Sequence, residues 1–216
     1  MENRSREPFL ARLLIAFLIT GFVFGIIFFV SYQISYANSR AIKSSNSLID
    51  QSLFQMDTLL RSNYSCNDSL LVSSSSLLDE NGKMISILET RLGFDDPVVM
   101  QEKGVYSSLE WDHYELIKTF DEKCSKNFYP FLFIYSNKNH KSESENAGSI
   151  LSAFKQEHPD SVMIYSFDAD LNYPILNSLK KDYPLNSFPV IITPRNETLY
   201  LTNINQLEFL INNTRQ

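Results

Sequence analysis

The sequence has little glycine, cysteine and histidine, and no excess of basic residues. Its six glycines form neither of the two common glycine-rich phosphate loops. Two cysteines and three histidines leave no cluster with the spacing of zinc ligands, so we expect no metal site and no cofactor. A net charge of −6 and a pI near 5.1 argue against a nucleic-acid partner, because phosphates require a basic surface.

A long apolar run near the N-terminus is the strongest signal present. The run from Leu13 to Val30 contains 18 residues and no charge. As a helix it would span about 27 Å, close to the hydrocarbon thickness of a bilayer. We therefore expect a transmembrane helix over residues 13–36 in contact with membrane lipid, preceded by a short N-terminal segment, residues 1–12.

Basic residues flank the apolar run on both sides, with Arg4, Arg6 and Arg12 before it and Arg40 and Lys43 after it. This bias predicts a cytoplasmic N-terminus and a C-terminal part outside. Two alternatives stay open. In the first, the run is a buried core helix. In the second, it is a signal peptide cleaved after Ala37, although the run is longer than the usual apolar core of a signal peptide.

Residues 37–126 have the period of helices and predict an extracytoplasmic stalk. Apolar residues first recur every seven positions, which is typical of a coiled-coil face. Two further helices are then expected, Cys66–Leu92 and Pro97–Cys124, separated by a turn at Gly93 with Asp96 as the N-cap. Arms of nearly equal length bring both cysteines to one end of an antiparallel hairpin, so an exterior location favours a Cys66–Cys124 disulfide.

The last part of the chain, residues 130–213, alternates short apolar strands with helices. Strands are expected at 131–135, 162–167, 188–193 and 198–201. Helices are expected between the first three strands, the second of them starting at Asp168–Asp170, and at residues 205–212. The order is β-α-β-α-β-β-α, which predicts an α/β domain with a parallel pair and a late antiparallel hairpin.

This order resembles the thioredoxin fold. Ser187-Phe188-Pro189-Val190 stands where that family has a cis-proline before its third strand, and Asp168-Ala169-Asp170 is similar to its usual exit from the second strand. The resemblance implies a cis bond before Pro189. The layout as a whole also resembles uncharacterised membrane-anchored proteins of archaea.

Thioredoxin-like oxidoreductases carry C-x-x-C between the first strand and the first helix, but here residues 136–144 contain no sulfur. Dithiol exchange needs a thiolate, so we expect no enzyme activity and no catalytic residue in this domain. The polar loop precedes a helix N-terminus at the carboxyl end of a strand, a place where ligands bind. The candidate peptide-binding residues are Asn137, Lys138, His140, Phe188 and Pro189, although a solvated connection is the favoured interpretation of the loop.

The leading functional hypothesis is a non-catalytic, membrane-anchored protein that presents a redox-inactive thioredoxin-like domain to a protein or peptide. A second hypothesis is an accessory thiol-disulfide protein that uses Cys66 and Cys124. A third is a structural membrane protein whose stalk associates as a coiled coil.

Overall fold

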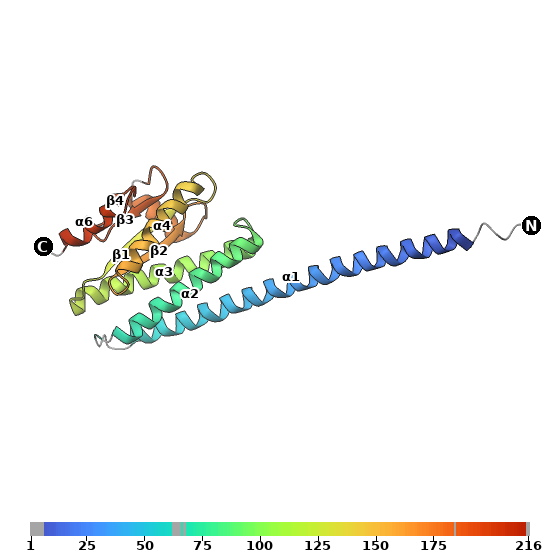
Figure 1. Ribbon diagram of the computed structural model, residues 1–216. Coiled ribbons are helices and arrows are strands. Elements are labelled where there is room, and N and C mark those ends of the chain that lie inside the picture. The colour runs from blue at the N-terminus through green and yellow to red at the C-terminus, as the bar shows by residue number, and fades with distance from the viewer. Residues whose placement is uncertain (1–6, 62–65, 67, 184, 215–216) are drawn as a thin grey trace, which may run out of the picture. The chain divides into compact units, whose positions relative to one another are not determined.

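The computed structural model describes residues 7–61, 66, 68–183 and 185–214. The chain divides into two compact units, Met1–Ser44 and Ser45–Gln216. The first helix, α1 (Glu7–Arg61), has 55 residues and continues without a break past the expected end of the membrane segment (Figure 1). Within it, Leu10–Arg40 is the one helix of the described residues that is long and apolar enough to cross a membrane, by length and composition.

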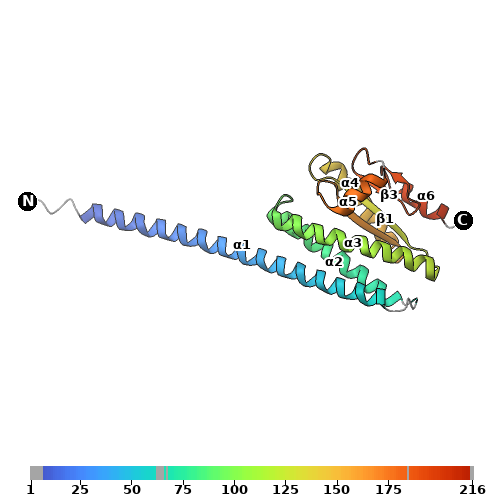
Figure 2. The same ribbon diagram turned by 180° about the vertical axis from the view of Figure 1, so that it is seen from behind.

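Two further helices form a hairpin. The helix α2 (Asp68–Leu92) ends at Gly93, whose φ of 96° lies in the left-handed region that glycine adopts without strain. The helix α3 (Pro97–Cys124) begins after Asp96, whose carboxylate accepts a hydrogen bond from Val98 N at 2.8 Å. The expected bounds of α3 are therefore confirmed, while α2 begins two residues beyond Cys66. Figure 2 shows α2 and α3 side by side.

A disulfide joins the open end of this hairpin. The sulfurs of Cys66 and Cys124 are 2.08 Å apart and close a loop with a sequence separation of 58. Cys124 is the last residue of α3, and Cys66 stands just before α2. The pairing agrees with the expectation drawn from arms of equal length.

A mixed four-stranded sheet follows the hairpin. Its order is β2-β1-β3-β4, from β1 (Tyr129–Tyr135), β2 (Val162–Asp168), β3 (Val190–Ile192) and β4 (Thr198–Leu199). The strands β1 and β2 are parallel, while β3 is antiparallel to both β1 and β4. The expected parallel pair and late antiparallel hairpin are thus present.

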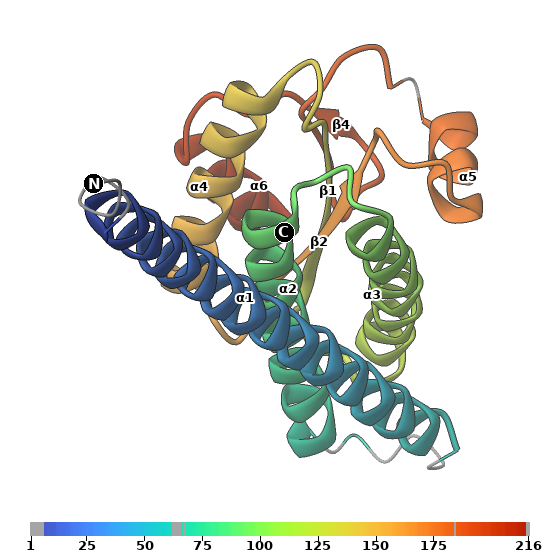
Figure 3. The same cartoon turned by 90° about the vertical axis from the view of Figure 1, so that its right-hand side faces the viewer.

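Helices cover both faces of the sheet, which is why β1 is almost continuously apolar (Figure 3). The helices α4 (Lys141–Glu157) and α6 (Asn205–Thr214) pack on one face around Phe131, Phe154 and Leu207. The helices α3 and α5 (Pro174–Asp182), with part of α2, pack on the other around Leu109, Ile134 and Phe167.

The expected start of the helix between β2 and β3, at Asp168–Asp170, was wrong. Residues 168–170 end β2 and form a turn, and α5 begins only at Pro174. The carboxylates of Asp168 and Asp170 are occupied by contacts outside α5, and Pro174 suits the first turn of a helix, where its missing N–H is not needed. The strands β3 and β4 are also shorter than expected.

Candidate functional site

A cleft runs along β2, the strand at one edge of the sheet. Two cavities of about 430 and 700 Å³ open there and share residues of α2, α3, α4, β1 and β2. We call this region the edge cleft and define it by the six shared residues: Gly82, Tyr106, Phe133, Glu145, Ser152 and Ser166. Volumes of this size are typical of sites for small ligands or short peptide segments.

One end of the edge cleft contains a buried ionic cluster. The ammonium group of Lys103 lies 2.6 Å from Glu89 Oε1 and also pairs with Asp168. It sits 5.3 Å from the centre of the Tyr135 ring. Burial alone would lower the pKa of Lys103, but its acidic and aromatic neighbours together raise the pKa above its ordinary value. Lys103 is therefore a fixed positive charge.

Asn137, one of the candidate peptide-binding residues, belongs to the same cluster. Its side-chain amide donates to Asp168 Oδ2 at 3.1 Å and reaches Glu89 Oε1 at 3.5 Å. Asn137 also lines the smaller cavity. The loop after β1 therefore contributes a side chain to the edge cleft.

The backbone of the same loop encloses a carboxylate of the chain itself. Asp170 Oδ2 accepts hydrogen bonds from Asn137 N at 2.7 Å and Lys138 N at 2.9 Å. The hydroxyl of Ser136 donates to both carboxylate oxygens, at 3.1 and 3.2 Å. The amides of the polar loop are thus occupied by a carboxylate of the chain itself.

The middle of the edge cleft is bordered by a buried carboxyl group. Glu110 on α3 is 2% exposed, and its Oε1 accepts a hydrogen bond from Ser166 N at 2.8 Å. Burial raises the pKa of Glu110 to about 8, so the group is largely protonated at neutral pH. Its Oε2 is one of two buried side-chain atoms without a hydrogen-bond partner among the described residues, the other being Asn81 Oδ1.

His113, one turn of α3 further along, is also buried. Its Nδ1 lies 2.8 Å from the Tyr165 hydroxyl and its Nε2 lies 3.0 Å from the Ser74 hydroxyl. Burial lowers the pKa of His113 to about 3, which keeps the ring neutral. The histidine therefore links α2, α3 and β2 as a structural group.

The other candidate peptide-binding residues line neither of the two cavities. Lys138 is exposed and pairs with Asp95 at 3.0 Å, while His140 is the N-cap of α4 without a side-chain cap bond. Phe188 packs against the core on the α5 side, and the Phe188–Pro189 bond is cis, in agreement with what the resemblance implied. Of the five residues, the structure places Asn137 in the edge cleft.

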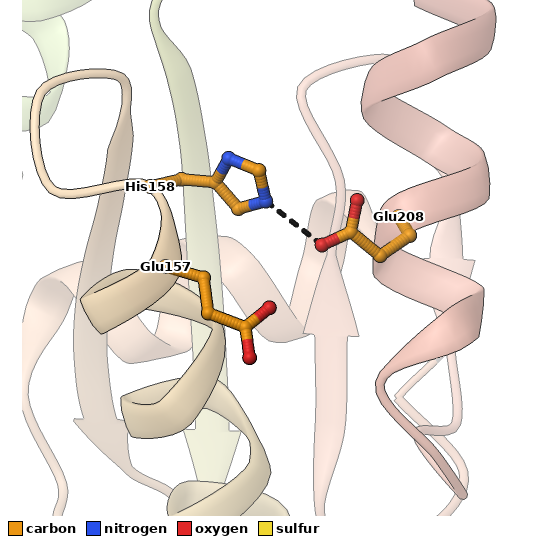
Figure 4. A group of neighbouring side chains, drawn as sticks. All are labelled: Glu157, His158 and Glu208. Carbon is orange, nitrogen blue, oxygen red and sulfur yellow. Dashed lines mark hydrogen bonds and ion pairs between the residues drawn. The ribbon is translucent and has the colours of Figure 1, made fainter.

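A second group of titratable side chains joins α4 to α6. Ligand atoms of Glu157, His158 and Glu208 lie within 4.8 Å of one another, and His158 Nε2 is 2.8 Å from Glu208 Oε1 (Figure 4). These residue types suit a divalent metal, but Glu157 is exposed and the imidazole already bonds a carboxylate. We interpret the group as a contact between the two helices.

Sequence reasoning missed most of the edge cleft. Glu89, Lys103 and Glu110 are spaced along the hairpin like ordinary charges on the exposed faces of helices. The available signal was a charged residue that lies among apolar residues along a helix. Glu110, next to Leu109, carried this signal only weakly. Comparison with known proteins adds no assignment, since no protein-family model and no curated protein matches the chain.

Proposed function

We propose that this chain is a single-pass membrane protein whose C-terminal part is a thioredoxin-like recognition domain without redox activity. The strand order, with β1 and β2 parallel and β3 and β4 antiparallel, supports that assignment, as do helices on both faces of the sheet. The domain would bind a protein or peptide partner and perform no reaction on it.

The observation that carries the proposal is the edge cleft, a polar cavity beside an edge strand with no thiol in it. The chain has two cysteines, and they are bonded to each other at the end of the α2–α3 hairpin. Dithiol exchange is thereby left without a nucleophile at the cleft. Recognition is the use that remains for a cavity of this size and polarity.

The proposed placement puts the N-terminus in the cytoplasm and residues after α1 outside. Its support is the excess of arginine before the apolar run and the disulfide, because disulfides persist in oxidising compartments. Serine-to-cysteine variants of the full chain test this placement with a membrane-impermeant maleimide on intact cells. We expect labelling of Ser142→Cys and none of Ser5→Cys, whereas the reverse pattern would show the opposite orientation.

The absence of redox activity is tested on the full chain in detergent micelles. We expect no catalysis of insulin reduction by dithiothreitol, and no mixed disulfide between the cysteine that remains in Cys66→Ser or Cys124→Ser and a peptide that carries a disulfide. A trapped mixed disulfide would favour a thiol-disulfide protein that uses these cysteines and would contradict the proposal. A matched thioredoxin sample serves as the positive control.

A further inference from the structure

The outer edge of β2 borders the edge cleft. Among the described residues, β2 pairs with β1 alone. Backbone groups of alternate residues in a strand point to the same side, so Ile164 and Ser166 direct theirs away from β1. Ser166 N–H reaches Glu110, and both strand residues line the larger cavity.

Glu110 occupies part of this edge. Its Oε1 accepts from Ser166 N at 2.8 Å, and its Oε2 is fully buried beneath the cleft. The Tyr106 hydroxyl faces the same carboxyl group and donates to Leu78 O at 3.2 Å. A segment that enters the cleft therefore has the other edge groups of β2 to pair with, those of Ile164 and the Ser166 carbonyl.

The charges of the cleft indicate which segment it accepts. Its two cavities are lined by four carboxylates other than Glu110 and by two lysines. Lys103 pairs with Glu89 and Asp168, and Lys155 pairs with Asp79 at 2.6 Å. Glu145 pairs with neither of these lysines, and its contact is an exposed one of 3.8 Å to Lys141 on its own helix. A cationic side chain is the complement of that excess.

We propose that the edge cleft binds an extended peptide segment that carries a lysine or arginine. The segment lies along β2 as an added strand that pairs with Ile164 and with the carbonyl of Ser166, and its basic side chain lies beside Glu145. Apolar side chains of the segment meet Phe133 and Ile164 on the floor of the cleft. The inference rests on the proposed function and names the ligand class of the same cleft.

The test uses the full chain in detergent micelles and three acetylated, amidated pentapeptides, with binding followed by isothermal titration calorimetry. The first has a central lysine between two valines, with threonine at each end. The second has glutamate in place of lysine, and the third has both valines N-methylated. We expect a Kd below about 1 mM for the first and at least a tenfold weaker Kd for the others.

Variants of the chain locate the binding. Ser152 lines both cavities from an exposed position on α4, so Ser152→Trp should block the cleft and abolish binding. Asn146→Trp, at another exposed position on α4, should leave the Kd within about twofold. Glu145→Lys places a like charge beside the lysine of the peptide, so it should weaken binding at least tenfold, whereas Glu143→Lys, at an exposed position of α4 that lines neither cavity, should leave the Kd within about twofold.

Each outcome tests a different part of the proposal. Lysine-peptide binding that Ser152→Trp leaves intact would overturn the cleft assignment while peptide recognition by the domain would stand. No binding of the lysine peptide up to about 1 mM would overturn the ligand class named here. Equal binding by Glu145→Lys and Glu143→Lys would overturn the placement of the basic side chain beside Glu145, with an unfolding measurement on both variants as the check on folding. Insulin reduction by the full chain would contradict the proposed function itself.

Discussion

The carboxylate of Asp170 holds the backbone amide of Asn137 at 2.7 Å, so the loop after β1 is organised around an anion that the chain supplies. In an oxidoreductase of the resembled family, this segment carries the reactive sulfur. Here the same stretch has no cysteine, and its amides are already occupied by Asp170. The loop is therefore built to hold Asn137 in place at the edge cleft.

Removal of that carboxylate should loosen the loop. In Asp170→Ala, Ser136, Asn137 and Lys138 lose their acceptor, so we expect a loss of about 1–3 kcal/mol in the free energy of unfolding and faster exchange of the Asn137 amide. Urea denaturation followed by the fluorescence of Trp111, the single tryptophan, measures the first effect. Asp95→Ala, which removes an exposed partner of Lys138, is the control and should leave stability unchanged.

The ionic cluster at the end of the cleft should be far more sensitive than a surface pair. Lys103→Met leaves Glu89 and the buried Asp168 without their cation, which we expect to cost about 3–5 kcal/mol. Lys118→Met, on the same helix, removes an exposed contact with Glu115 and a charge 5.1 Å from the centre of the Tyr114 ring, and should cost less than about 1 kcal/mol. Equal losses in the two variants, measured by denaturation, would show that the Lys103 cluster does not hold the helices together.

The stability of the folded chain should depend on the ionisation of Glu110. Its pKa is raised by burial to about 8, against an ordinary value of 4.5, so the folded state binds a proton that the unfolded state releases. The corresponding stabilisation is present below pH 4.5 and is lost as the pH rises to 8. Tyr106 and Asp79 face this carboxyl group from α3 and α2, and Lys155 faces it from α4.

The variant Glu110→Gln cannot ionise, so its stability relative to the wild type should increase between pH 4.5 and 8, by a few kcal/mol at most. Any cost of burying the amide is independent of pH and shifts the whole difference curve without changing its slope. His113, with a pKa lowered to about 3, destabilises both proteins alike below pH 6.5 and cancels in the comparison. A flat difference curve from thermal unfolding would contradict the assigned shift.

A methyl group at Gly104 should be destabilising although alanine is the better helix former. The position lies within α3, where alanine normally gains about 1 kcal/mol over glycine. A Cβ there would overlap the ring of Tyr173, so we expect Gly104→Ala to lose about 1–3 kcal/mol. In a chain that already carries Tyr173→Leu, Gly104→Ala should cost less of the free energy of unfolding. Additive losses from the two substitutions would argue against close packing of these two residues.

The disulfide should stabilise the folded chain without taking part in binding. The double variant Cys66→Ser and Cys124→Ser frees a loop with a sequence separation of 58, for which the chain-entropy account gives a loss of about 4 kcal/mol. The Kd of the lysine pentapeptide should be unchanged under conditions where the variant is folded. A changed affinity at full folding would connect the sulfur pair to the cleft.

Local signals in the sequence predict much of this fold. Asp96, Pro97 and Gly93 define the turn between α2 and α3 because capping and left-handed backbone depend on neighbours in the chain. The apolar run before Ser136 predicts β1 for the same reason. The start of α5 was misplaced because an aspartate before a helix and an aspartate that closes a loop have the same appearance in sequence.

The edge cleft could not be predicted in this way. Glu110 meets Ser166 across 56 positions, and Lys103 meets Asp168 across 65. Each residue taken alone is a charge on a helix or at a strand end, which usually faces solvent. Only the packing of α3 against β2 turns these charges into a buried site.

The covalent link at the base of the hairpin has a mechanical consequence. Along the backbone, any pull between α1 and β1 passes through the whole of α2 and α3. The bond between Cys66 and Cys124 offers a shorter route, from the residue just ahead of α2 to the last residue of α3, five positions before Tyr129. Tension applied between α1 and β1 would therefore bypass both helices of the hairpin.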